Sequence, residues 1–226
     1  MPTLLSVLEP VPLSPRGGLG SPYARLNLRR NPFGEPTEEE LALLVVADLG
    51  EMTAWLALPG HALQLIGDCG RGKTARLLAL RALVEPAPPY VYLAEGEPIP
   101  ALPGSGMLLL DEAQRLPTRR LRALLRRLDR IALATHEDLE GELRRAGYEV
   151  RTETVAGLDL PTFEAIVERR LEWARLAAGP LPRLAEGGLA DLHARHGDDL
   201  RSALGELYDI YQRRIDGVRE ECDGQV

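Results

Sequence analysis

Eight consecutive residues carry the glycines and side chains from which a phosphate-binding loop is built: Gly67, Asp68, Cys69, Gly70, Arg71, Gly72, Lys73 and Thr74. They fit the pattern G-x-x-x-x-G-K-[ST]. Residues 62–66 before the loop predict a short buried strand, and residues 75–84 after it predict a helix with an apolar stripe. A strand, a glycine loop and a helix in this order direct backbone N–H groups and the positive end of the helix at an anion. The sequence therefore predicts a loop that binds the phosphates of ATP.

Lys73 stands out by composition as well as by position. The chain holds 27 basic residues, and Lys73 is the only lysine among them. A compact ammonium can curl over the β- and γ-phosphates, where the planar fork of an arginine does not serve. We therefore expect Lys73 to clamp the phosphates.

A second stretch supplies two carboxylates. Four apolar residues, 107–110, run directly into Asp111 and Glu112. Buried strands of parallel sheets are continuous apolar runs of this kind, so the acids would emerge at the carboxyl end of a strand, level with the phosphate loop. We expect Asp111 to hold Mg²⁺ together with Thr74, and Glu112 to orient or deprotonate an attacking water. The acid pair favours hydrolysis of ATP to ADP and phosphate over binding alone.

The residues Asp111, Glu112, Ala113 and Gln114 also spell a helicase-type box. That interpretation needs a second RecA-like domain, and only a small helical segment is expected after residue 155, so we set it aside. An ATP-transporter interpretation fails because no Leu-Ser-Gly-Gly signature occurs in the sequence.

A third polar strand end is predicted at Thr135, which follows the apolar residues 131–134 and precedes His136, Glu137 and Asp138. A polar side chain at this place can contact both the γ-phosphate and the attacking water. The alternative is that Thr135 or Asp138 caps the following helix, and that His136 is a surface residue. The sequence leaves both interpretations open.

Bulk composition narrows the class of protein. The 226 residues suffice for one α/β domain and a small appendage, and 45% hydrophobic residues allow a sizeable core. With a net charge of −7, any nucleic-acid binding must come from a local patch or from assembly. Neither Cys69 nor Cys222 suggests a disulfide framework; the first residues of the given sequence show no basic start followed by an apolar run, and no stretch in it is long enough to cross a bilayer. We expect a cytoplasmic protein without membrane insertion.

Strands and helices are predicted to alternate up to residue 155, and helices follow. This pattern implies an α/β fold of the P-loop NTPase type, a parallel sheet flanked by helices, with a small all-helical subdomain at the C-terminal side. Thr37 followed by three glutamates predicts the start of a helix. Residues 41–47 are ambiguous between helix and strand, and Val45 and Val46 favour a strand. Asp48 is a candidate cap for a helix over 49–58. Further strands are expected at 89–94, 107–112, 131–135 and 148–155, and further helices at 118–128, 137–146, 162–176, 186–195 and 199–214. The expected domains are an arm at 1–20, a core at 21–157, a helical lid at 158–214 and a polar tail at 215–226.

The order of these parts resembles an AAA+ ATPase over residues 23–214. A phosphate loop (Walker A), a strand ending in Asp111 and Glu112 (Walker B), a strand ending in Thr135, and a helical lid with Gly197-Asp198-Asp199-Leu200-Arg201 carry the resemblance. It is similar to small bacterial ATPases associated with secretion and transposition and to origin-recognition-type ATPases. The interval between the Walker motifs is short, with one strand.

The resemblance implies roles for further residues. It makes Thr135 the sensor 1 residue, Arg201 the sensor 2 residue, and Arg144 or Arg145 the arginine finger, although no Arg-Phe follows this pair. It also implies that Asn31, Pro32 and Phe33 pack near the adenine. A finger from a neighbouring subunit would stabilise charge on the transferring phosphoryl group, which implies a head-to-tail homo-oligomer or a partner ATPase.

Arginines crowd the helix predicted at 118–128. Arg119, Arg122 and Arg126 share one face and could hold a DNA backbone; the alternative is an ordinary exposed helix. The sequence thus predicts a Mg²⁺-dependent ATPase whose turnover drives conformational switching or assembly, with DNA as a candidate partner. The competing function is a nucleotide-dependent switch or adaptor that recruits a protein partner without hydrolysis.

Overall fold

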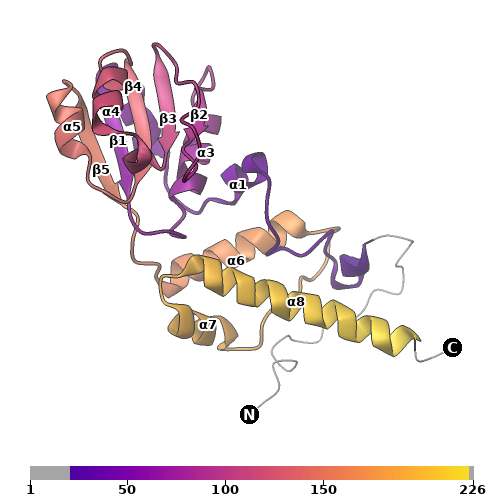
Figure 1. The fold of residues 1–226 in the computed structure, drawn as a ribbon. Helices are drawn as coiled ribbons and strands as arrows, with labels where there is room; N and C mark the ends of the chain where they lie inside the picture. The colour runs from indigo at the N-terminus through magenta and orange to yellow at the C-terminus, as the bar shows by residue number, and fades with distance from the viewer. Residues whose placement is uncertain (1–20, 224–226) are drawn as a thin grey trace. The chain divides into compact units, whose positions relative to one another are not determined.

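The computed structural model describes residues 21–223, and the side chains of residues 21–216. These residues form two compact units (Figure 1). One unit is residues 36–157 and contains the sheet; the other joins residues up to 35 to the segment from 158 onward and is helical. The predicted arm, residues 1–20, lies outside the described residues.

The sheet has five strands, all parallel, in the order β2-β3-β4-β1-β5. The predicted fold class, a parallel sheet flanked by helices with helices at the C-terminal side, is confirmed. Because β4 lies between β1 and β3, three of the predicted functional strand ends are neighbours. The strands are β1 (His61–Ile66), β2 (Tyr90–Tyr92), β3 (Met107–Asp111), β4 (Arg130–Thr135) and β5 (Glu149–Thr154).

Helices cover both faces of the sheet. Consecutive side chains of a strand point to opposite faces, so the apolar strands present apolar side chains on both sides of the sheet. Leu109 packs in the cluster with α2 (Gly50–Leu56) and α3 (Lys73–Leu83), whereas Leu110 packs with α4 (Thr118–Leu125) and α5 (Glu140–Arg145). Both leucines are fully buried. The continuous apolar runs of the sequence are thus explained by burial on two sides.

The helix start predicted at Thr37 is confirmed: Thr37 caps α1 (Glu38–Leu44), and it does so in a capping box with Glu40. Thr37 Oγ1 accepts from the Glu40 N–H at 3.3 Å, and Glu40 Oε2 accepts from the Thr37 N–H at 2.9 Å. The ambiguous stretch is helical to Leu44, and the strand favoured by Val45 and Val46 is wrong, because no neighbouring strand pairs with this segment in the part of the chain described.

The helix that follows α1 along the chain is shorter than the sequence predicted. Its predicted range was 49–58, and α2 spans Gly50–Leu56. Asp48 does contact its first turn, since Asp48 Oδ1 accepts from the Gly50 N–H at 2.9 Å.

The helical unit contains α6 (Leu160–Ala174), α7 (Gly188–His196) and α8 (Leu200–Asp223), with a short 3-10 turn at Pro22–Leu26. Its boundaries differ from the predicted ones at two places. Residues 21–35, expected in the core, pack here because Leu28 and Phe33 are buried among these helices. The expected tail at 215–226 is instead helical to Asp223, and Ile215 is 2% exposed in the same cluster. Within residues 21–223, no helix has the length and apolarity needed to cross a membrane.

We predict that Tyr148→Phe destabilises the sheet unit by about 1–2 kcal/mol at neutral pH, because the buried hydroxyl shares its proton between the carbonyl oxygens of Leu125 (2.9 Å) and Leu128 (2.7 Å). Burial, and then the charge of Asp129, raises the pKa of Tyr148 from 10.0 to about 12. The folded protein therefore holds this proton where the unfolded chain releases it, and the contribution is lost as the pH rises from 10 to 12. Urea unfolding of both proteins should show a gap in stability that narrows over this range; a constant gap would contradict the assignment.

Candidate functional site

The predicted phosphate loop connects the end of β1 to the start of α3. At two of its positions, Gly67 and Gly72, the structure explains why the residue is glycine. A Cβ on Gly67 would lie 2.4 Å from the carbonyl oxygen of Val155, so no side chain fits there. Gly72 has φ +87° at the position directly before α3, a left-handed conformation that favours glycine. The loop thus keeps the backbone close to β5 and begins α3 at Lys73.

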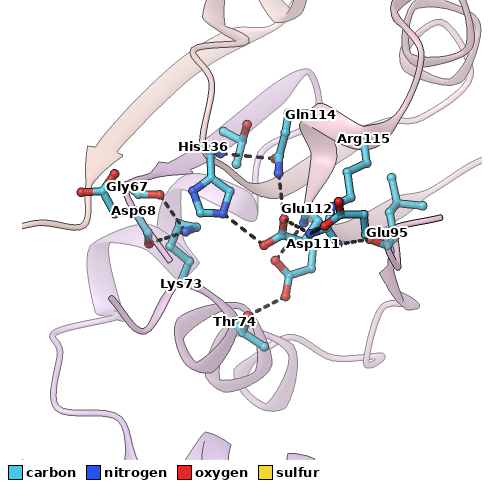
Figure 2. Close-up of polar contacts among 12 residues, drawn as sticks. Gly67, Asp68, Lys73, Thr74, Glu95, Asp111, Glu112, Gln114, Arg115 and His136 are labelled. Carbon is cyan, nitrogen blue, oxygen red and sulfur yellow. Dashed lines mark hydrogen bonds and ion pairs between the residues drawn. The ribbon is translucent and has the colours of Figure 1, made fainter. Parts of the chain in front are cut away.

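Lys73 is folded into this loop and is 5% exposed. Its Nζ donates to the carbonyl oxygens of Gly67 and Asp68, both at 2.7 Å. Burial lowers the pKa of Lys73, and the charges of Glu112 and Asp111 oppose that shift. The ammonium is therefore a partly desolvated cation, held where an anion bound by the loop would meet it (Figure 2).

Asp111, at the end of β3, is fully buried, and its carboxylate accepts hydrogen bonds from Thr74, Tyr90 and the Glu112 backbone. Thr74 Oγ1 donates to its Oδ2 at 2.7 Å, and the Tyr90 hydroxyl donates to the same oxygen at 2.9 Å. Its Oδ1 accepts from the Glu112 N–H at 2.9 Å. Burial, and then the charge of Asp111, raises the pKa of Tyr90, so this phenol stays a donor. The structure thus brings Thr74 and Asp111 together, as predicted for a shared cation.

Glu112 leaves the strand in a left-handed conformation with φ +57°, which is uncommon for a residue other than glycine. Its carboxylate is 14% exposed and meets three side chains (Figure 2). Gln114 Nε2 donates to Oε2 at 2.7 Å, an Arg115 guanidinium nitrogen lies 3.2 Å from the same oxygen, and His136 Nε2 lies 3.4 Å from Oε1. The backbone conformation and these contacts hold the carboxylate beside Asp111.

Thr135, at the end of β4, is also fully buried. Its hydroxyl donates to the Glu137 carbonyl oxygen at 2.8 Å and accepts from the Glu137 N–H at 3.0 Å. Its own carbonyl oxygen accepts from the Gly67 N–H at 3.3 Å. Thr135 therefore adjoins the loop while its side chain closes the turn after β4.

Asp138, one of the two residues that the capping interpretation named, contacts the start of α5, although the N-cap position itself is Leu139 and its side chain makes no cap hydrogen bond. Asp138 Oδ1 accepts from the Glu140 N–H at 2.8 Å and from Gln64 Nε2 at 2.9 Å. These two bonds, the Gln64 bond first, lower the pKa of Asp138. The predicted helix at 137–146 is therefore shorter, because residues 136–139 form this turn and α5 begins at Glu140.

Three polar residues that the sequence analysis did not select organise the site: Gln64, Tyr90 and Gln114. Gln64 is a fully buried amide in the apolar strand β1, and its Oε1 accepts from the Leu139 N–H at 2.7 Å. A polar residue within an apolar strand run was the signal for Gln64, and adjacency to the acid pair was the signal for Gln114. Tyr90 gave no local signal, because its contact with Asp111 is made across two strands.

The candidate finger residues are engaged on their own helix. Arg144 Nε lies 2.7 Å from Glu140, and an Arg145 nitrogen lies 2.5 Å from Glu142. Both guanidinium groups are more than half exposed. Among the described residues, these ion pairs link neither arginine to the phosphate loop.

The remaining predicted residues lie in the helical unit. Asn31 and Phe33 are each 6% exposed; Asn31 Oδ1 accepts from the Phe33 N–H at 3.0 Å, and Pro32 O accepts from Arg170 at 3.3 Å. Arg201 is exposed in the first turn of α8. In the loop itself, the Cys69 thiol is free and exposed.

Strand β1, the glycine loop, α3 and the neighbouring carboxylates of β3 define an α/β fold of the P-loop NTPase type. No protein-family model matches the chain, and no curated protein matches it. Solved structures similar to it are Cdc6p from Pyrobaculum aerophilum (19% identity, TM-score 0.49), a DNA replication initiation factor (15%, 0.47) and the ORC2 protein of Aeropyrum pernix in ADPNP-ADP complexes (15%, 0.46).

The aligned regions cover 82%, 80% and 83% of this chain and 66%, 66% and 71% of the three structures. The chain thus spans about two thirds of the length of the first two. The residue roles below rest on the contacts within this chain.

We predict that Gln64→Leu lowers the free energy of unfolding by about 1–3 kcal/mol, because it leaves the Leu139 N–H without its acceptor and Asp138 without one donor. Urea unfolding followed by circular dichroism measures the change. Thr152→Val is the comparison variant, which removes the longer 3.2 Å contact of Gln64 and the exposed 3.0 Å bond from the Thr152 hydroxyl to Glu140. It should cost less because it leaves the bonds of Gln64 to Leu139 and Asp138 in place. An unchanged midpoint in Gln64→Leu would contradict the role of the buried amide.

Proposed function

We propose that the protein binds ATP with Mg²⁺ and hydrolyses it to ADP and phosphate, and that turnover drives conformational switching or assembly. The observation that carries the proposal is the 2.7 Å hydrogen bond from Thr74 to Asp111, beside a buried Lys73 that lies within the glycine loop. A loop cation, a hydroxyl and a strand-end carboxylate within contact distance are the groups that a Mg²⁺–triphosphate requires.

The donor set fits Mg²⁺. Adjacent oxygens around this ion lie about 3 Å apart, and the ion is usually held by one or two protein oxygens together with phosphate oxygens and waters. Thr74 Oγ1 and Asp111 Oδ2 are 2.7 Å apart and are the oxygens that would face it. When bound, Mg²⁺ supplies charge neutralisation to the phosphates.

The loop and Lys73 would bind the phosphates. N–H groups of residues 67–74 would cradle them, with Gly67, Asp68, Cys69, Gly70, Arg71, Gly72, Lys73 and Thr74 as the binding segment. Lys73 Nζ would exchange its bonds to two loop carbonyls for bonds to phosphate oxygens, which offer its charge a stronger partner.

Glu112 would act as the general base. Its carboxylate is next to Asp111, partly accessible, and held by contacts with the side chains of Gln114, Arg115 and His136. A base fixed in this way can accept a proton from a water that attacks the γ-phosphate. Thr135, at the neighbouring strand end, would orient the same water.

Further residues would complete the site on assembly or from the helical unit. We propose Arg144 or Arg145 as a finger supplied to a neighbouring subunit in a head-to-tail homo-oligomer or by a partner ATPase, since both guanidinium groups are more than half exposed. Arg201 would sense the nucleotide from α8, and Asn31, Pro32 and Phe33 would contact the adenine.

DNA is a proposed partner through α4. Arg119, Arg122 and Arg126 are all exposed, but Arg122 forms a bidentate pair with Glu142 at 2.6 and 3.0 Å. Arg119 and Arg126 therefore carry the proposal, because within residues 21–216 no ion pair neutralises them. A reducing cytoplasm is the proposed location, in keeping with the free Cys69 thiol.

One observation favours a second candidate, a nucleotide-dependent adaptor that does not hydrolyse ATP. The Glu112 carboxylate is already bound by Gln114, Arg115 and His136, and such contacts can hold a base out of use. Turnover decides between the two functions.

We predict that ATP turnover per subunit rises with protein concentration, because the finger would come from a neighbour. Glu112→Gln should lower turnover at least about 100-fold while ATP binding persists, since it removes only the base. Lys73→Met is the control that should lose binding itself. Turnover is measured by phosphate release, with and without DNA, and stimulation by DNA at low salt would support that partner. Tight ATP binding with no turnover in the unmodified protein would sink the hydrolase and leave the adaptor.

We also predict that Tyr90→Phe raises the Mg²⁺ concentration needed for half-maximal turnover by about 10-fold, because Asp111 loses the donor that helps to orient it. A magnesium titration of turnover at saturating ATP measures this. Tyr208→Phe, on α8 and partly exposed, is the control that should behave as the unmodified protein. Equal magnesium requirements in both variants would rule out a role for Tyr90 in the cation site.

A further inference from the structure

Gln114 is a single side chain that joins the candidate base to the turn after β4 (Figure 2). Its Nε2 donates to Glu112 Oε2 at 2.7 Å, and its Oε1 accepts from the His136 backbone N–H at 3.2 Å. A carboxylate can only accept and a backbone N–H can only donate, so the amide has one orientation that satisfies both neighbours. Gln114 is therefore fixed at both ends.

The bond from Gln114 affects which carboxylate oxygen of Glu112 remains open to a water molecule. Each carboxylate oxygen can accept about two hydrogen bonds. Oε2 is occupied by Gln114 Nε2 and the Arg115 guanidinium, at 2.7 and 3.2 Å, whereas among the described residues Oε1 contacts His136 Nε2 alone, at 3.4 Å. The oxygen that keeps an open acceptor position is Oε1, and the donors on Oε2 decide which oxygen that is.

Of the two groups that contact Oε2, Gln114 lies closer, and the guanidinium of Arg115 also contacts other residues. An Arg115 nitrogen donates to the Leu93 carbonyl oxygen at 2.7 Å, and its guanidinium also lies 3.5 Å from Glu95. Glu112 itself lies in a left-handed conformation just past the end of β3. The orientation of Glu112 therefore depends chiefly on Gln114.

The side-chain oxygen of Gln114 accepts from the backbone of the turn after β4, and this turn adjoins the phosphate loop. His136 directly follows Thr135, whose carbonyl oxygen accepts from Gly67 of the phosphate loop at 3.3 Å. A movement of this turn would be passed to Glu112 through one rigid amide.

We propose that Gln114 is a positioning residue for hydrolysis: it turns Oε1 of Glu112 to the attacking water and couples the base to the turn at His136. This inference rests on the proposed ATPase function. It assigns Gln114 no contact with the nucleotide.

The test compares Gln114→Met with Gln114→Glu. Methionine keeps the length of the side chain but removes both polar contacts. Glutamate keeps an acceptor for the His136 N–H and places a negative charge against Glu112. We expect both variants to lower kcat about 10- to 100-fold, the worth of a hydrogen bond to a charged group. The Kd of a non-hydrolysable ATP analogue should change by less than about twofold, because binding does not use Gln114.

Three outcomes would contradict the proposal, and each has a different cause. If Gln114 serves only to brace the turn, Gln114→Glu will retain kcat, and the proposal is overturned. If both variants lose kcat and analogue binding together, Gln114 is part of the general structure of the site, and the proposal is again overturned. Unmodified protein without any turnover would instead refute the proposed function, and this inference with it.

A double-mutant cycle gives the independent check. In a Glu112→Gln background, Gln114→Met should produce no further loss, because the group that it positions is gone. Additive losses would contradict a role through Glu112. Glu149→Gln, exposed on the edge strand β5, is the control that should keep kcat, and circular dichroism confirms that each variant folds.

Discussion

The contact between Thr74 and Asp111 depends on the parallel register of β3, β4 and β1. Leu110 of β3 pairs with Leu133 of β4, and Ile66 of β1 pairs with Thr135, the last residue of β4. The carboxyl ends of the three strands therefore reach the same edge of the sheet. A side chain on the first turn of α3 then lies 2.7 Å from a carboxylate that is 37 residues away in sequence.

Electrostatics at this edge explain why the site is suited to an anion. Lys73 loses hydration on burial, and this lowers its pKa, while the carboxylates of Glu112 and Asp111 act in the opposite direction. A charge with reduced hydration interacts more strongly with a ligand charge than the same group in water does. The carbonyl oxygens that now accept from Lys73 are neutral, so phosphate oxygens would be stronger partners for it.

The helical unit also holds a buried cation, in a different setting. Arg170 is 7% exposed, and burial lowers its pKa to about 10. It donates to the carbonyl oxygens of Pro32 and Gly34, at 3.3 and 3.4 Å. The segment proposed to contact adenine is thus fixed to α6 by an internal arginine, and Phe33 packs edge-on against Tyr211, with ring centroids 5.1 Å apart.

Local sequence determined the elements and the candidate site residues of this protein. The glycine spacing, the apolar runs before Asp111 and Thr135, and the capping pattern at Thr37 act over a few residues, and these are the features that sequence reasoning identified. The parallel α/β class followed from their alternation. Only the tertiary structure decided which distant groups support the site: Tyr90 donates to Asp111 from another strand, and Gln114 connects Glu112 to the backbone N–H of His136 in the turn after β4. It likewise decided that residues 21–35 pack with the helices, since Leu28 and Phe33 gain burial from residues more than a hundred positions away. Periodicity records which face of an element is buried, but not what covers it, and that is the physical limit of the sequence.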